Sequence, residues 1–123
     1  MARASDQKSL PGSRWEIKAE RFLHEQGLTT VSRNFRCRLG EIDLIMEDGP
    51  CLVFAEIRYR RNSGFGTGAE SVTLAKQNRL IRAARKYLQL RSHRSQQTCR
   101  FDVLSLSEKD GRLNVEWIRN AFC

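Results

Sequence analysis

Acidic side chains concentrate within residues 36–61, where two apolar segments are joined at Asp48-Gly49. An Asp-Gly pair between such segments is a strong signal for a β-hairpin. A turn centred on this pair predicts that Asp43 lies opposite position 54. Glu41 then lies opposite Glu56, and all three carboxylates share one face. Opposed Cβ atoms lie about 5 Å apart and diagonal ones roughly 7–8 Å, so the three acids are expected to converge at the open end of the hairpin.

These acids need a positive partner, because like charges repel and a charge is costly to remove from water. The hairpin is apolar on both faces, which puts the acids at the edge of a core. Oxygen ligands suit Mg²⁺, which is commonly held by one or two carboxylates with waters and substrate phosphates. The alternative is an ordinary sheet in which Arg38, Arg58 and Arg60 neutralise the acids. The spacing alone leaves both interpretations open.

The composition favours a polyanionic partner. The chain has 123 residues, enough for one domain, with a formal charge of +8 and an isoelectric point near 9.9. Arginine outnumbers lysine by 17 to 5, and its planar guanidinium can bind two phosphate oxygens at once. Nucleic acid is therefore the first expectation for a partner, and an anionic membrane surface the second.

The ends and the cysteines predict a cytoplasmic protein. No apolar run is long enough to span a membrane, and residues 1–12 lack the apolar core of a secretory signal, so we expect a disordered leader there and one domain over 13–123. The cysteines match no zinc spacing and are expected to be reduced thiols. They are Cys37, Cys51, Cys99 and Cys123.

The first predicted helix, residues 13–26, carries further acids. Ser13 and Glu16 fit a capping box, so Glu16 has a structural explanation as well as a chemical one. Glu20 lies one turn later, where it could join an acidic site or face solvent. A strand over 28–35 follows and leads Arg33, Arg36 and Arg38 toward the hairpin.

A glycine-containing loop over 59–69 follows the hairpin and lacks a phosphate-binding fingerprint. With Arg60 and Arg61 at its base it could close over a phosphate backbone or simply connect two elements. Residues 70–90 show helical periodicity, with one apolar face and one basic ridge. The ridge consists of Lys76, Arg79, Arg82 and Lys86. Solvation is the default for such charges, although a bound anion would relieve their repulsion.

Alternating segments over 98–106 and 113–118 predict two more strands. The order helix, three strands, helix, two strands indicates an α/β domain with helices packed on a central mixed sheet.

Residues 40–45, Gly-Glu-Ile-Asp-Leu-Ile, and residues 52–60, ending in Glu-Ile-Arg-Tyr-Arg, closely resemble the YraN family of small bacterial proteins. The supporting matches are Glu16-x-x-Ala19-x-x-Phe22-Leu23, Arg33-Asn34-Phe35-Arg36, Glu70-x-Val72, Lys76-x-x-Arg79-Leu80, Arg100-Phe101-Asp102-Val103 and Asn120-Ala121-Phe122. Together they cover residues 14–123 in the family's order and spacing.

The resemblance implies a restriction-endonuclease-like domain, similar to archaeal Holliday-junction resolvases, that acts on DNA, including branched DNA. It also implies an active site in which Glu16 is the helix acid, while Asp43 and Glu56 hold Mg²⁺ or Mn²⁺. Glu41 belongs to the family's Gly-Glu-Ile-Asp element, and its role stays open. Relatives of the resolvase type pair as dimers, so a homodimer that uses the last strand is a further expectation.

The chain departs from the family pattern at position 58, where Arg58 replaces the lysine of a Glu-x-Lys motif. Lysine can help to deprotonate a water molecule, whereas arginine keeps its charge and can only stabilise negative charge. Lys76 could substitute in space. Two hypotheses follow, an Mg²⁺-dependent endonuclease and a catalytically attenuated DNA-binding module.

Overall fold

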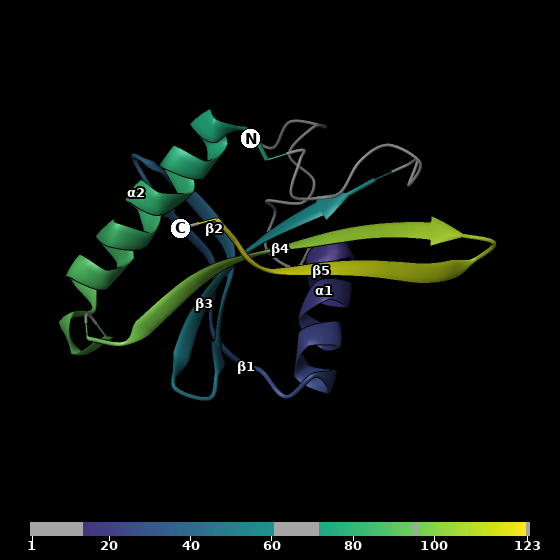
Figure 1. Cartoon of the computed structure of the whole chain (residues 1–123), viewed down its shortest axis with the longest axis horizontal. Helices are drawn as coiled ribbons and strands as arrows, with labels where there is room; N and C mark the ends of the chain where they lie inside the picture. The colour runs from purple at the N-terminus through teal and green to yellow at the C-terminus, as the bar shows by residue number, and fades with distance from the viewer. Residues whose placement is uncertain (1–13, 61–71, 95, 123) are drawn as a thin grey trace.

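The described residues fold into a five-stranded sheet with α-helices on both faces, as the computed structural model shows (Figure 1). The structure describes residues 14–60, 72–94 and 96–122. The predicted leader, Ser13, the loop from Arg61 onward, Glu70 and Cys123 lie outside these ranges. The elements are α1 (Arg14–Glu25), β1 (Thr29–Cys37), β2 (Gly40–Asp48), β3 (Cys51–Tyr59), α2 (Leu74–Leu90), the short 3₁₀ helix η3 (Ser92–Arg94), β4 (Thr98–Lys109) and β5 (Arg112–Phe122).

The strands lie in the sheet in their sequence order. Among the strands that the structure describes, β3 and β4 alone pair in parallel, and the crossover between them contains α2. The other three pairs are antiparallel, so the predicted mixed sheet is confirmed. This α/β arrangement is consistent with the restriction-endonuclease-like fold that the resemblance implies. None of the helices described is both long and apolar enough to cross a membrane.

Two separate cores hold the layers together. Ala19 and Leu23 of α1 pack on one face of the sheet, with Met46 and Val53 among their neighbours. Leu80, Ala84 and Tyr87 of α2 pack on the other face, where Ile45, Leu52 and Phe54 point. Alternate residues of β2 and β3 thus enter opposite cores, which explains why this hairpin is apolar on both sides.

The second helix begins later than its periodicity predicts. Residues 72 and 73 are not helical, so the predicted start at position 70 is wrong. Thr73 has an extended backbone and its hydroxyl accepts a hydrogen bond from the backbone N–H of Lys76 at 3.2 Å. The first turn is therefore capped at Thr73, which fixes where the side chain of Lys76 leaves the helix.

The turn between β2 and β3 also differs from the prediction. Asp48 pairs with Cys51, so the loop consists of Gly49 and Pro50, and Gly49 supplies the positive φ of 58°. Moving the loop by one residue moves the pairing by two, and position 54 faces Ile45 instead of Asp43. A shift of two keeps every side chain on its predicted face. Continued along the strands, this register brings Asp43, rather than Glu41, opposite Glu56.

Candidate active site

Asp43 lies where β2 separates from β3. The regular pairing of these strands runs from the hairpin turn to the pair of Leu44 with Ala55. Asp43 is therefore the first residue of β2 beyond the paired region. The Asp43 side chain is fully buried, and its Oδ2 accepts a hydrogen bond of 2.8 Å from the backbone N–H of Ile57. The carboxylate therefore sits in the gap between the two strands and takes the place of a backbone acceptor there.

The backbone beside Asp43 is irregular on its other side as well. The pairs Arg33 with Leu44 and Phe35 with Ile42 place Asn34 across from Asp43. Asn34 has a φ of 53°, in the left-handed region, and the regular pairing of β1 with β2 omits this position. Sparsely populated backbone conformations inside a strand cluster at functional sites. The distortion marks this end of β2 as specialised.

Glu56 is buried in β3 with two cations beside it. Only 2% of the residue is exposed. The Lys76 Nζ lies 3.1 Å from Oε2 of Glu56, and the Arg58 Nη1 lies 3.8 Å from the same oxygen. Lys76 reaches Glu56 because α2 packs on the face to which Phe54 and Glu56 both point. A lysine therefore stands beside Glu56 although position 58 holds arginine.

Glu16 is also buried, with 3% exposed, in the first turn of α1 on the opposite side of the sheet from α2. Across the described ranges, no three or more His, Cys, Asp or Glu side chains form a group that could hold a metal ion. The predicted convergence of three acids is thus not observed as a group of that kind. The structure instead places Asp43 and Glu56 on neighbouring strands, each just beyond the last regular pair of β2 with β3, and adds Lys76 beside Glu56.

Glu20 and Glu41 each lie beside an arginine of β1. Arg33 contacts both oxygens of Glu20, at 2.9 Å to Oε1 and 2.7 Å to Oε2. Burial by itself raises the pKa of Glu20, but hydrogen bonds from Arg33 and Thr30 outweigh it and hold the pKa below its usual value. Arg36 lies 3.4 Å from Oε2 of Glu41. The Glu20 contacts brace α1 against β1.

Apart from Lys76, which contacts Glu56, the described cations that are predicted to bind nucleic acid fall into two groups. Arg33 and Arg36 contact the acids just described, and Arg60 lies 3.9 Å from Glu116. Within the part of the chain that the structure describes, the other group makes no ion pair with an acid. Its members are Arg38, Arg79, Arg82 and Lys86, together with Arg85, which the sequence analysis did not single out although it follows Arg82 at a spacing of three.

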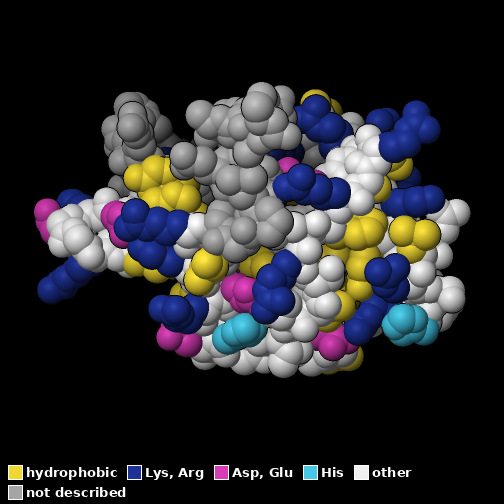
Figure 2. Space-filling model, turned by 180° about the vertical axis from the view of Figure 1, so that it is seen from behind, with side chains coloured by type: hydrophobic (Ala, Val, Ile, Leu, Met, Phe, Trp, Pro, Cys, Tyr) yellow, Lys and Arg dark blue, Asp and Glu magenta, His cyan; other side chains and the backbone are white. Residues whose placement is uncertain are grey.

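Basic side chains also predominate on the face that Figure 2 shows. Lys and Arg, in dark blue, are more prominent there than Asp and Glu, and several gather on the side where the reversed view puts α2. Arg61 lies outside the described ranges. Among the predicted nucleic-acid-binding cations that the structure describes, those without an acid partner lie on α2 and the β1–β2 turn.

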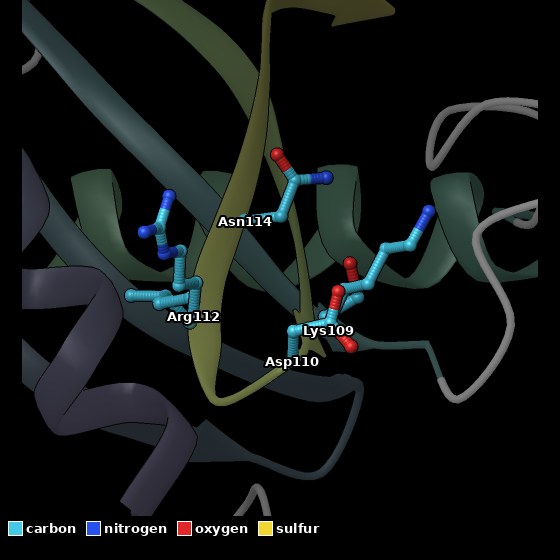
Figure 3. A pocket seen from close by; sticks show the side chains of 6 residues that line it. Lys109, Asp110, Arg112 and Asn114 are labelled. Atoms are coloured by element: carbon cyan, nitrogen blue, oxygen red, sulfur yellow. The ribbon is translucent and has the colours of Figure 1, made fainter.

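A hollow of about 730 Å³ lies elsewhere, at the end of the β4–β5 hairpin that extends away from α2 (Figures 1 and 3). Figure 3 shows Lys109, Asp110, Arg112 and Asn114 around this turn. None of the predicted site residues lines it. It is separate from the candidate active site.

The comparison with known proteins bears on the family. Residues 15–106 match the model of an uncharacterised protein family, UPF0102, which is the YraN family. The chain belongs to the UPF0102 family. A UPF0102 protein of Nitrosospira multiformis is 53% identical over 113 residues, which is 92% of each chain. UPF0102 proteins of Nitrosococcus oceani and Nitrosomonas europaea are 49% and 50% identical and are covered over 90% and 92% of their lengths.

One motif that supported the UPF0102 resemblance has a structural explanation. Asp102 is 1% exposed and accepts hydrogen bonds from Arg100 Nε at 3.0 Å, from Trp117 Nε1 at 2.9 Å and from the backbone N–H of Asn120 at 2.9 Å. The bonds from Trp117 and Asn120 fasten β5 to β4 at the bulge in their pairing. The Arg-Phe-Asp-Val segment therefore holds the sheet together.

Proposed function

We propose that this UPF0102 protein binds DNA and hydrolyses its phosphodiester bonds with the help of a divalent metal ion held by Asp43 and Glu56. The observation that carries the proposal is the contact of Lys76 Nζ with the buried Glu56 carboxylate. Glu56 belongs to β3, which is the neighbour of the strand that carries Asp43. Two buried carboxylates and one lysine from a neighbouring helix supply the residue types that such chemistry requires. The basic surface of α2 supports a polyanionic substrate.

The two strand carboxylates fit a magnesium ion. Mg²⁺ is commonly held by one or two carboxylates, while waters and substrate phosphates complete its coordination. A site of this kind needs no third acidic side chain from the protein. When bound there, the ion would lower the pKa of a bound water and neutralise charge on the phosphate.

The protein's own side chains have distinct roles in this proposal. Lys76 orients the attacking water. Once it has released its own proton to solvent, its neutral amine can accept the proton of that water, whereas a guanidinium keeps its proton at ordinary pH. Arg58 stays charged and stabilises the negative charge that develops on the phosphate. Glu16 keeps the role that the family resemblance implies, that of the active-site acid on the first helix, α1. The cations of α2 hold the phosphate backbone.

A DNA-binding module without catalysis is the second candidate, and one observation favours it. Lys76 and Arg58 both approach Oε2 of Glu56, so the acid already has positive charge beside it without a metal ion. In that case the ion pairs serve stability and only the cationic surface serves function.

Incubation with linear, flapped and four-way DNA in Mg²⁺ or Mn²⁺ tests both candidates. Asp43→Asn keeps an oxygen acceptor for the Ile57 N–H but removes the charge, and Asp110→Asn in the β4–β5 turn is the matched control. Cleavage that Asp43→Asn abolishes and Asp110→Asn retains supports the nuclease. Salt-sensitive binding with no cleavage by any protein supports the module. If the wild type neither binds nor cuts DNA at low salt, both are excluded.

We propose also that the protein acts in the cytoplasm as a homodimer. The thiols of Cys37, Cys51 and Cys99 are free, which supports a reducing compartment. The sheet has β1 and β5 as its edges, and an edge strand can pair with a second copy. Sedimentation of the purified protein tests the dimer, and a monomer at micromolar concentration would exclude it.

A further inference from the structure

The outer surface of α2 carries five cations and no acid. Arg79, Arg82 and Arg85 are exposed, and Lys86 is half-buried. Except for Lys76, these side chains make no ion pair with an acid among the residues that the structure describes. Like charges one turn apart on a helix repel, so this surface is stabilised when an anion approaches it.

The turn between β1 and β2 packs against the middle of α2. A Cβ on Gly40 would lie 3.2 Å from the backbone oxygen of Arg79, so the turn and the helix are in close contact. Two adjoining hollows, of about 460 and 340 Å³, lie beside this contact and share Leu39 and Lys86. Arg38, Arg82, Arg85 and Gln89 contribute to their walls. Together the hollows form one basic groove.

An apolar side chain stands at the centre of this groove. Leu39 is 46% exposed at the tip of the turn and lines both hollows. Single exposed leucines are common on protein surfaces, so exposure alone carries no meaning. The position of Leu39 is distinctive because the charged residues that line the groove around it are all cations. An exposed apolar side chain surrounded by cations suits a polyanion that also offers an apolar face.

Nucleic acid is such a ligand, because its backbone is anionic and the flat faces of its bases are apolar. Proteins that kink DNA insert apolar side chains between bases, while cations hold the phosphates on either side. An intact duplex resists this because its bases are stacked, whereas bases at a nick, flap or junction are unstacked at lower cost.

We propose that Leu39 is a wedge that stacks against a base at an interruption of the duplex, with Arg38, Arg82, Arg85 and Lys86 binding the flanking phosphates. This inference rests on the proposed DNA binding and adds a preference for branched substrates. It assigns that preference to the β1–β2 turn, outside the pair of strand carboxylates.

The test measures binding of the full chain to a four-way DNA and to a linear duplex of the same length, each with 2-aminopurine beside the branch point or its equivalent. We expect the wild type to bind the four-way DNA more tightly and to raise its 2-aminopurine fluorescence, which reports unstacking. Leu39→Ala is expected to weaken four-way binding about tenfold, to leave linear binding within about twofold and to abolish the fluorescence rise.

Leu113→Ala is the matched control, since Leu113 is exposed to a similar degree on the β4–β5 hairpin outside the groove, and it should behave as the wild type. Equal losses on both DNAs in Leu39→Ala would overturn the wedge, as would no loss on either, while DNA binding itself would stand. A wild type that binds neither DNA would overturn the proposed function and the wedge together. Thermal melts of all variants confirm that each is folded.

Discussion

Lys76 Nζ lies 3.1 Å from Glu56 Oε2, although Lys76 belongs to α2 and Glu56 to β3. A Glu-x-Lys motif would bring its lysine from the same strand as its glutamate, and here that strand position is Arg58. The helix therefore supplies the primary amine, and the strand supplies a guanidinium 3.8 Å from the same oxygen. The two cations can be varied independently, which makes their roles separable.

Replacement of Lys76 separates a catalytic from a structural role. We expect Lys76→Ala to lower the DNA cleavage rate by about 10²–10⁴-fold, the usual contribution of a proton-transfer group. Unfolding free energy should fall by about 1–3 kcal/mol because Glu56 loses a charged hydrogen-bond donor. Lys76→Arg should restore the stability, measured by urea denaturation, but not the cleavage rate. Full activity in Lys76→Arg would argue that only positive charge matters at this point.

Arg58→Lys should make the site more active. A second amine beside Glu56 can orient or deprotonate water, and we expect an increase of about tenfold in single-turnover cleavage, equal to about 1.4 kcal/mol of transition-state stabilisation. The comparison is made at saturating protein with Mg²⁺. If Arg58→Lys and the wild type both bind DNA and both remain inactive, the nuclease proposal is seriously weakened.

Asp102 provides a test of structure without chemistry. Asp102→Ala should lower the unfolding free energy by about 1–3 kcal/mol, because donors of Arg100, Trp117 and Asn120 lose their common acceptor. Asp102→Asn keeps one of the two acceptor oxygens and should therefore lower the unfolding free energy by less. DNA affinity of the folded fraction should not change. A large and selective loss of affinity in Asp102→Asn would instead place this residue in the binding site.

Glu47 should contribute to acid sensitivity. Hydrogen bonds from Gln97 and Arg94, each 2.8 Å long, hold its pKa below the usual 4.5. Because the pKa is lower in the folded state, the stabilisation is complete well above pH 4.5 and is lost as the pH falls through the folded value. In thermal melts between about pH 3 and about pH 7, the Tm of Glu47→Gln should fall less steeply on acidification than the Tm of the wild type. An equally steep fall would contradict this assignment.

Much of the fold follows from local patterns in the sequence. The Asp48-Gly49 pair, the alternating strands and the helical periodicity of residues 70–90 predict the order of elements and the mixed sheet correctly. The errors lie where a single residue decides a boundary. The Thr73 cap starts α2 later, and the Gly49-Pro50 loop shifts the hairpin register by two residues.

Local sequence patterns predict less of the candidate site than of the fold. Asp43 and Glu56 stand out because carboxylates interrupt apolar strands. Their relation to Lys76 depends on how α2 packs, which no spacing along the chain encodes. Arg33 contacts Glu20, which charge content alone does not show, and its contact with nucleic acid stays a prediction. Arg85 follows Arg82 at a spacing of three on α2, so helical periodicity alone is enough to place it on the basic ridge.

The sequence order of the strands has a kinetic consequence. Asp43 and Glu56 belong to the consecutive strands β2 and β3, whereas Lys76 lies on the crossover to β4. Segments close in sequence meet with a smaller loss of chain entropy than distant ones. We therefore expect local folding to bring the two carboxylate-bearing strands together first, and the ammonium group to reach Glu56 when α2 docks. In this order, docking of the crossover helix also completes the charge arrangement around Glu56.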